Sequence, residues 1–274
     1  MIFIYSAWDG FCSALKEKGI VSIPAREVSD KQGTFLVLKH DIENTVSKAY
    51  RLAEIEHKYG HRGTYYAHAY LLDDPENVEL LRKMQAMGHE VSYHYDVMDS
   101  NHGDLSSAIA EFEANRKRFG ELGFPITTVC QHGNPVVERV GYTSNRDFFR
   151  SGRVQSLYPQ IADIMVDFKE KHRTDYTYFS DAGRKFKMIF DPITNDIINS
   201  DDKNIPYESL DDLIAALPAR AIISTHPHRW TESAVSYLVK EKVFNVIKSA
   251  AKLAMKVPPL RKIMSRYFYL AKKI

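Results

Sequence analysis

Short runs of apolar and β-forming residues recur along the chain, and segments with helical spacing separate them. Five of these runs are predicted to be strands: residues 35–38, 63–67, 89–96, 126–130 and 221–224. Between the first four, helices are predicted over residues 46–59, 74–87 and 104–122. This alternation is typical of an α/β protein with a parallel sheet or barrel and right-handed crossovers.

The middle of the chain, residues 136–204, is less periodic. Two more strands are predicted there, over residues 161–168 and 176–179, and a helix is predicted over residues 210–217. No internal repeat or low-complexity linker divides these elements. A single domain over residues 1–241 is therefore expected, with residues 242–274 forming a separate tail.

Polar side chains that bind protons or metal ions come at the ends of four predicted strands. They are Asp41 and Glu43 after the first, His94 in the third, His132 after the fourth, and His226 and His228 after the last. Because the carboxyl ends of parallel strands meet on one face, these groups are expected to converge. A carboxylate with imidazoles suits Zn²⁺ or a similar divalent ion, which activates water for attack on a carbonyl. A second carboxylate can then act as base and another histidine as acid.

Composition narrows the class of protein. The 274 residues are 44% hydrophobic and 26% charged, which is ordinary for a globular chain with a sizeable core. The two cysteines, Cys12 and Cys130, have no metal-binding spacing and form no disulfide framework. The start of the chain does not have the pattern of a signal peptide, and no apolar run approaches the ~20 residues that span a bilayer. A cytoplasmic protein is expected.

Charge is distributed unevenly around a net value of +2. Residues 242–274 hold nine of the 37 lysines and arginines and none of the 35 acidic residues, so the tail is +9 and the remainder −7. The tail is predicted to form amphipathic helices that bind an anionic membrane surface, which would make the protein peripheral at the inner face. A terminal helix packed on the domain is the plainer alternative. Nucleic-acid binding is disfavoured because the body is acidic and has no recognition motif.

Four segments in order resemble the motifs of the polysaccharide deacetylases, the NodB-homology group also called carbohydrate esterase family 4. They are Leu-Lys-His-Asp-Ile-Glu at 38–43, Gly-His-Glu-Val-Ser-Tyr-His at 88–94, Cys-Gln-His-Gly-Asn-Pro at 130–135 and Ser-Thr-His-Pro at 224–227. The resemblance covers residues 35–230. It is strongest to a branch with an "HDVD"-like first motif, associated with lipopolysaccharide and capsule biosynthesis. It implies a distorted (β/α) barrel and metal-dependent removal of acetyl groups, mostly N-acetyl, from sugars.

The same resemblance implies roles for individual residues. Asp41 matches the base of the first motif, and Glu43 matches a metal ligand. His94 matches the first metal histidine of the second motif, and His226 matches the catalytic acid of the fifth. Asp181 is the best match to the aspartate that orients these groups.

Two departures from the family pattern stand out. Met98 occupies the position of the second metal histidine, and a thioether is a poor ligand for Zn²⁺ in such a site. His132 is expected to replace it from the next strand end. Glu43 is one methylene longer than the family's aspartate, so it keeps the negative charge but places the ligating carboxylate in a different position. Substrate contacts are expected from Tyr95, Asn134, Arg184, His228 and Trp230. Packing in the core is the alternative for Tyr95, and for Trp230 it has equal weight.

The leading hypothesis is a Zn²⁺-dependent deacetylase acting on an acetylated sugar or lipid-linked glycan in surface-polysaccharide synthesis. The alternative is a catalytically silent member that binds a glycan or assembly partner, having lost the ligand at Met98. Two further histidines receive plainer assignments. His89 is expected to be a structural hydrogen-bonding group. His68 follows the second strand, and nothing in the sequence supports a role for it at the rim of the site.

Overall fold

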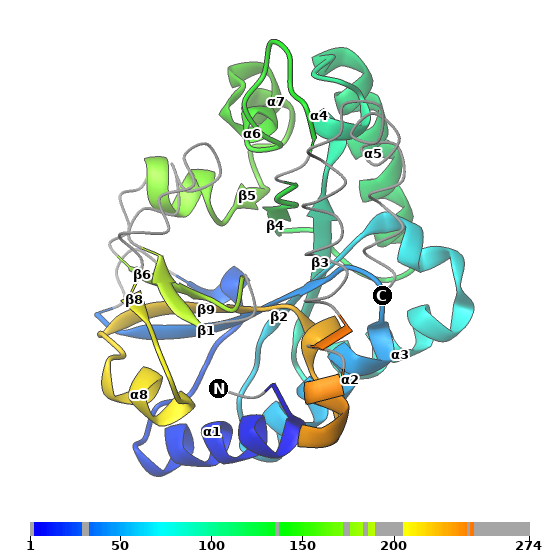
Figure 1. Ribbon diagram of the computed structural model, residues 1–274. Helices are drawn as coiled ribbons and strands as arrows, with labels where there is room; N and C mark the ends of the chain where they lie inside the picture. The colour runs from blue at the N-terminus through cyan, green and yellow to red at the C-terminus, as the bar shows by residue number, and fades with distance from the viewer. Residues whose placement is uncertain are drawn as a thin grey trace.

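A nine-stranded, mostly parallel sheet flanked by helices organises the chain (Figure 1). The computed structural model describes residues 3–28, 33–134, 137–171, 176–182, 186–189, 205–239 and 242–243. The strands are β1 (Phe35–Ile42), β2 (Thr64–Ala67), β3 (Glu90–Tyr95), β4 (Thr128–Gln131), β5 (Ala162–Asp163), β6 (Thr177–Ser180), β7 (Lys187–Ile189), β8 (Ile205–Pro206) and β9 (Arg220–Thr225). Their order in the sheet is β5-β4-β3-β2-β1-β9-β6-β7-β8, with antiparallel pairing only for β6–β7 and β7–β8. The predicted α/β class is confirmed.

Helices connect the parallel strands and cover the sheet. They are α1 (Tyr5–Glu17), α2 (Val46–Lys58), α3 (Pro75–Ala86), α4 (Val97–Ser100), α5 (Leu105–Glu121), α6 (Asp147–Arg150), α7 (Gly152–Leu157) and α8 (Leu210–Ala215). Short 3₁₀ turns are η1 (Ala25–Glu27), η2 (Ala69–Asp73) and η5 (Pro227–Arg229), and η3 (Val166–Lys171) is a π-helical turn. Helix α1 packs against α2 and α8, and α2 packs against α3 (Figure 1).

The ends of the helices follow from local sequence chemistry. Asp74 caps α3 by accepting the Glu76 backbone N–H, and a proline occupies the first helical position, where its missing N–H costs nothing. Asp104 caps α5 in the same way through the Ser107 backbone N–H. Just past α2, Gly60 adopts a φ of 81°, which few other residues tolerate. The three helices predicted between the first four strands are confirmed.

Strand β1 lies at the centre of the sheet. It pairs in parallel with β2 on one side and β9 on the other, and all eight of its residues are buried. A parallel strand covered on both faces explains the unbroken apolar run at its start. The same burial means that the polar residues at its end need partners within the protein.

The strand predicted over residues 161–168 is wrong beyond its first residues. Strand β5 stops at Asp163, whose buried carboxylate accepts the backbone N–H groups of Met165 and Val166, both at 2.8 Å. Asp167 in turn accepts the Asp163 backbone N–H at 2.7 Å. Side-chain acceptors so close in sequence compete with the sheet for backbone donors, and the chain turns into η3 instead.

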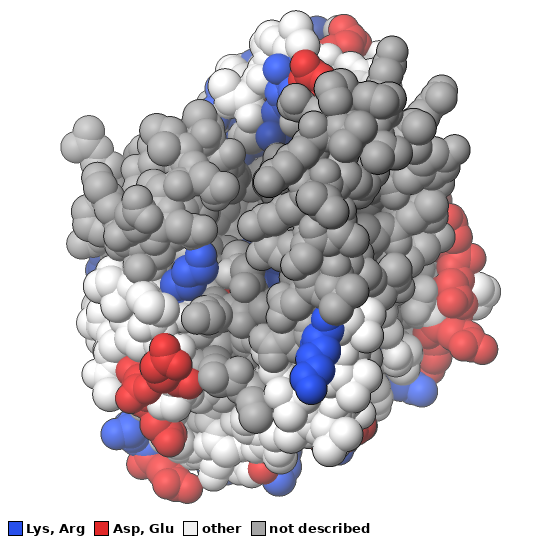
Figure 2. Space-filling model, viewed as in Figure 1, with Lys and Arg blue, Asp and Glu red and all other residues white. Residues whose placement is uncertain are grey.

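The basic tail lies almost entirely outside the described residues, and its membrane role stays a prediction. Among the described helices, none is both long and apolar enough to cross a membrane. Exposed acidic side chains gather near the start of α3 and over α8 (Figure 2). They are Asp73, Asp74, Glu76 and Glu79 at the first place and Glu208, Asp211 and Asp212 at the second.

Candidate functional site

The register of the sheet brings the polar strand ends together. On β1, β2 and β3, Ile42, Ala67 and Tyr93 lie side by side. The next residues along these strands form the following row: Glu43, His68 and His94. On the other side of β1, His40 pairs with Thr225 of β9, so that Asp41 and His226 come next to each other. The predicted convergence of strand ends is therefore found for these residues.

His226 faces both carboxylates of the first motif. Its Nε2 atom lies 3.9 Å from Asp41 Oδ2 and 3.9 Å from Glu43 Oε1. The other ring nitrogen, Nδ1, is 2.5 Å from Asp181 Oδ1. One edge of the imidazole is thus anchored, and the other is aimed at the two carboxylates.

Asp181, at the end of β6, fixes the position of His226. It is fully buried. Its carboxylate accepts hydrogen bonds from the His226 backbone N–H at 3.0 Å and from Arg229 Nη1 at 2.8 Å. Burial favours the protonated acid, but Arg229 and His226 outweigh it and hold the pKa of Asp181 well below its usual range. Asp181 therefore stays ionised and keeps the His226 proton on Nδ1.

Asp41 is held by a buried lysine. Lys39 lies two residues earlier on the same face of β1, and its Nζ is 2.6 Å from Asp41 Oδ2, with both side chains at most 8% exposed. Burial opposes the charge on Lys39, yet the neighbouring Asp41 raises the pKa of Lys39 well above its usual value. The second carboxylate oxygen, Asp41 Oδ1, is buried without a hydrogen-bond partner. One oxygen of this carboxylate is thus paired and the other is available.

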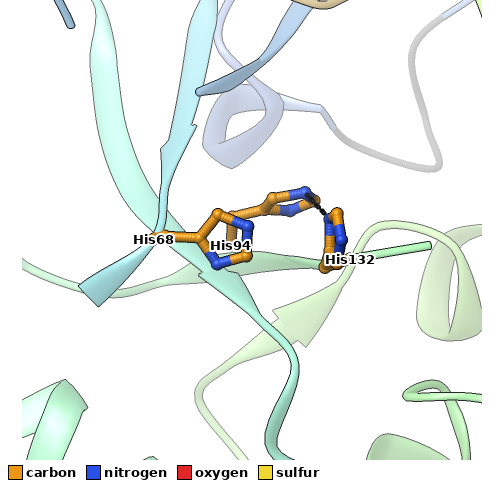
Figure 3. Close-up of side chains that lie close together, drawn as sticks. All are labelled: His68, His94 and His132. Carbon is orange, nitrogen blue, oxygen red and sulfur yellow. Dashed lines mark hydrogen bonds between the residues drawn. The ribbon is translucent and has the colours of Figure 1, made fainter. Parts of the chain in front are cut away.

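Three buried imidazoles face one another across β2, β3 and β4 (Figure 3). His94 Nε2 lies 3.2 Å from His132 Nδ1, and the His68 ring centroid is 4.8 Å from each of the other two. All three residues are at most 4% exposed. The sequence predicted the pairing of His94 with His132 and missed His68.

The imidazole cluster has the donor chemistry of a divalent metal site. The far nitrogen of His94, Nδ1, lies 3.0 Å from the Cys130 carbonyl oxygen, which orients the ring as metal-bound histidines are commonly oriented. Burial, helped by neighbouring His68 and Lys39, lowers the pKa of His94 well below its usual value. A neutral imidazole keeps the lone pair that a metal needs. The residues present therefore fit a divalent ion.

A second group, Asp41, His94 and Cys130, also offers ligand atoms within 4.8 Å of one another. Burial raises the pKa of the Cys130 thiol well above its usual value, so the thiolate that metals bind is disfavoured. Lys39 also occupies the neighbourhood of Asp41. The three histidines are the better metal site. Cys12 and Cys130 are both free and buried.

Glu43, the predicted carboxylate ligand, stands beside the imidazoles. Its Oε1 lies 4.0 Å from His132 Nδ1, and the side chain is 17% exposed. Among the described residues it belongs to neither group of potential ligands. Its backbone carbonyl accepts a hydrogen bond from the Tyr70 hydroxyl.

Met98 is directed into the core. It lies on α4, is 4% exposed and belongs to the apolar cluster that contains Tyr95 and Phe112. The thioether there has a packing role, in agreement with the expectation that it is no metal ligand.

Two of the expected substrate contacts are wrong. Trp230 is fully buried, packed against Phe3 and Trp8, so that it has no surface to stack on a sugar. Tyr95 is fully buried as well, and its hydroxyl donates to Asp163 at 2.5 Å. Tyr95 directly follows His94 on β3, and alternation along a strand points neighbours to opposite faces. Trp230 follows the 3₁₀ turn η5, and its ring packs into the apolar cluster instead.

The other three expected contacts have different outcomes. Asn134 is partly buried, and its backbone carbonyl oxygen accepts a hydrogen bond from Arg139 Nη2 at 2.9 Å. The His228 ring lies 5.9 Å from that of His226, and burial with the adjacent Arg229 lowers its pKa well below the usual value. Their substrate roles stay predictions. Arg184 lies outside the described residues.

His40 and His89 are structural. His40 points away from Asp41, with Nε2 2.8 Å from the buried Glu56 and Nδ1 2.6 Å from the Thr225 hydroxyl. His89 accepts the Gly63 N–H at 2.9 Å and lies 3.1 Å from the Ala53 carbonyl oxygen. The structural assignment predicted for His89 is confirmed.

A polar cavity of about 370 Å³ borders the imidazole cluster through His68. Its lining includes Tyr70, Asp96, Glu111 and Arg118. Ligand pockets begin at roughly this size, and a mixed lining of aromatic and charged groups is suited to a hydroxyl-rich molecule.

Known structures with a similar arrangement include a family 4 carbohydrate esterase from Streptomyces lividans, with a TM-score of 0.42 and 16% identity over 71% of this chain and 79% of that one. The peptidoglycan deacetylase PdaC from Bacillus subtilis has a TM-score of 0.40 and 13% identity over 72% and 76%. A family 4 pseudoenzyme from Bacillus anthracis has a TM-score of 0.37 and 11% identity over 85% and 66%. No family model and no curated protein matches the sequence.

The resemblance of the chain to the family 4 carbohydrate esterases is carried by its four sequence motifs. The HDVD-like branch stays a prediction. Since these TM-scores lie below 0.5, the activity proposed below rests on the chain's own residues.

Proposed function

We propose that this protein is a metal-dependent hydrolase that removes an acetyl group from a sugar. The observation that carries the proposal is the meeting of three kinds of group at one edge of the sheet. These are a carboxylate with a free oxygen, an anchored imidazole and a cluster of buried imidazoles. Acyl hydrolysis needs a base, an acid and a group that stabilises the developing oxyanion, and each has a candidate here.

The side chains divide the proton transfers between them. The unpartnered Oδ1 of Asp41 is the acceptor for the proton of the attacking water. His226, with Nδ1 tied to Asp181, takes up that proton from Asp41 on Nε2 and gives it to the leaving nitrogen as the C–N bond breaks. A divalent ion held by His94 and His132 would polarise the acetyl carbonyl and lower the pKa of water. The products are acetate and a free amino sugar.

The finer assignment is part of the same proposal. We take the group removed to be N-acetyl, the ion to be Zn²⁺, and the substrate to be a lipid-linked or surface glycan in lipopolysaccharide or capsule synthesis. The motif resemblance supports these choices, and the polar cavity beside His68 offers space for a sugar ring. The protein is proposed to be cytoplasmic, with its basic tail at the membrane surface.

Acetate release from N-acetylglucosamine oligomers by the Zn²⁺-loaded protein tests the proposal. Asp41→Asn is expected to lower turnover about 10²–10⁴-fold with metal retained, because the proton acceptor is lost. Glu54→Gln on the partly exposed side of α2 is the matched control and is expected to leave turnover unchanged. Activity that persists in Asp41→Asn would remove this base from the mechanism.

A catalytically silent, glycan-binding protein is the second candidate. The observation in its favour is the tight Lys39–Asp41 pair, which holds one oxygen of the proposed base. This candidate predicts binding of the same oligomers by calorimetry with no acetate released by the metal-loaded wild type. Release that depends on Asp41 would exclude it.

A further inference from the structure

We propose that His68 is the third protein ligand of the metal, completing a three-imidazole set with His94 and His132 and leaving Glu43 outside it. This inference rests on the proposed function for the presence of the ion, and it assigns the ligands differently from the family pattern. In that pattern the second motif supplies two histidines, one of which is replaced here by Met98.

The position of His68 in the sheet supports this assignment. His68 follows directly after β2, which lies between β1, the strand that Glu43 follows, and β3, the strand that carries His94. Because Ala67 pairs with Tyr93, His68 and His94 are neighbours in the next row. A ligand missing from the segment after β3 can therefore be supplied by the adjacent strand end without any change of backbone.

Geometry is the second argument. His68, His94 and His132 each offer a nitrogen within 4.8 Å of the other two, and the three rings converge from separate strand ends (Figure 3). Ligand atoms about 2.1 Å from a tetrahedral zinc ion lie roughly 3.4 Å apart, so small side-chain rotations close the set. Glu43 Oε1 lies 4.0 Å from His132 Nδ1, and Glu43 belongs to neither described group of potential ligands.

Neighbouring groups hold the three imidazole rings in position. The His68 ring stacks on Tyr70 at 5.2 Å between centroids, and His94 is oriented by the Cys130 carbonyl. The backbone N–H of His132 donates to the Tyr95 carbonyl oxygen at 2.7 Å. The His132 carbonyl oxygen accepts a hydrogen bond from Asn145 Nδ2 at 2.9 Å. Contacts of this kind hold ligands in place before the metal arrives.

The assignment leaves Glu43 with a different task. Its Oε1 lies between two imidazoles, 4.0 Å from His132 Nδ1 and 3.9 Å from His226 Nε2. A carboxylate there can accept a hydrogen bond from the substrate or from water beside the ion. We expect its loss to affect turnover and to leave metal affinity nearly unchanged.

Metal titration of the full-length, metal-free protein tests the ligand set, with Co²⁺ absorption and Zn²⁺ competition as readouts. His68→Ala is expected to weaken affinity about 100-fold or more and to change the Co²⁺ spectrum, whereas Glu43→Gln stays within about threefold of wild type. His57→Ala, which removes an exposed histidine of α2, controls for adventitious binding. His68→Asp is expected to recover part of the affinity because a carboxylate can also bind zinc.

Two results would overturn the inference. In the first, the His68→Ala variant binds metal as tightly as wild type while the Glu43→Gln variant loses metal binding. In the second, the wild-type protein binds no metal. If His68→Ala fails to fold, as judged by circular dichroism without metal, His68→Gln replaces it in the same titration. Acetate release is measured separately, so a metal site built on His68 without deacetylation would sink only the proposed function.

Discussion

The two halves of the candidate site hold buried polar groups in opposite electrical states. Around β1, β6 and β9 the groups are charged and tightly paired: Lys39 with Asp41, and Asp181 with Arg229 and His226. Around β2, β3 and β4 the groups are three imidazoles, and Glu43 Oε1 lies 4.0 Å from one of them, His132. Lys39, Asp41 and Asp181 in the first half are at most 5% exposed, as are the three imidazoles of the second.

The difference shows that burial alone does not decide ionisation. Loss of water disfavours the charged form of any group, and a close opposite charge can reverse the effect. Asp181 keeps its charge because Arg229 is 2.8 Å away, while burial with the neighbouring His68 and Lys39 lowers the pKa of His94 despite its contact with the Cys130 carbonyl. One half is therefore equipped to move protons and the other to donate lone pairs.

Removing the charge of Asp181 is expected to have the largest effect. Asp181→Asn would lower turnover about 10²–10⁴-fold, because an amide can donate to His226 Nδ1 and stabilise the wrong tautomer. Metal affinity, which depends on the other half, is expected to stay within about threefold. Steady-state kinetics and the Co²⁺ titration measure the two effects, with the exposed Asp211→Asn as control. A parallel loss of metal would contradict the separation of the halves.

Breaking the Lys39–Asp41 pair is expected to come next. Lys39→Met leaves a buried carboxylate without its partner and would reduce the free energy of unfolding by ~3–5 kcal/mol, measured by urea denaturation of the metal-free protein. The exposed Lys117→Met should change it by less than ~1 kcal/mol. In the double variant with Asp41→Asn much of the stability should return. If the double variant is as unstable as the single one, packing rather than charge explains the loss.

The smallest expected effect concerns a neutral imidazole behind the site. Burial, only partly offset by Glu56, lowers the pKa of His89 to about 4. Between pH 6.5 and 4 the unfolded chain binds a proton at this residue that the folded protein excludes, so stability falls as the pH falls through this window. Because the pKa of His89 falls from 6.5 to about 4 on folding, the residue contributes ~3 kcal/mol to the free energy of unfolding at neutral pH.

His89→Gln tests that contribution in urea denaturation of the metal-free protein. The stability advantage of wild type over His89→Gln is expected to be largest near pH 7 and to shrink towards pH 4. Stability curves that run parallel across this range would contradict the prediction, because they would show that His89 has the same pKa in the folded and unfolded states.

The sequence predicted those parts of the fold and site that depend on local pattern. Asp74 and Asp104 marked the starts of helices through backbone chemistry that is legible in a few residues. Asp41, His94, His132 and His226 came together because carboxyl ends of parallel strands share one edge of a sheet.

What the sequence missed depends on register and on which face a side chain takes. His68 follows a strand without a distinctive motif, and only the pairing of Ala67 with Tyr93 places it beside His94. Tyr95 and Trp230 were interpreted as site residues, but both point into the apolar core. The turn after Asp163 arose from side-chain hydrogen bonds that a hydrophobic pattern does not reveal.

The two tryptophans of the chain provide an optical signal from directly behind the site. Trp8 and Trp230 are fully buried with ring centroids 5.1 Å apart, and Trp8 Nε1 donates to Glu56, which contacts His40 on β1. Two indoles this close and this rigid should couple, giving a strong near-ultraviolet circular dichroism band and blue-shifted fluorescence. Because His40 directly precedes Asp41, loss of the coupled band would signal loosening of the strand that carries the proposed base.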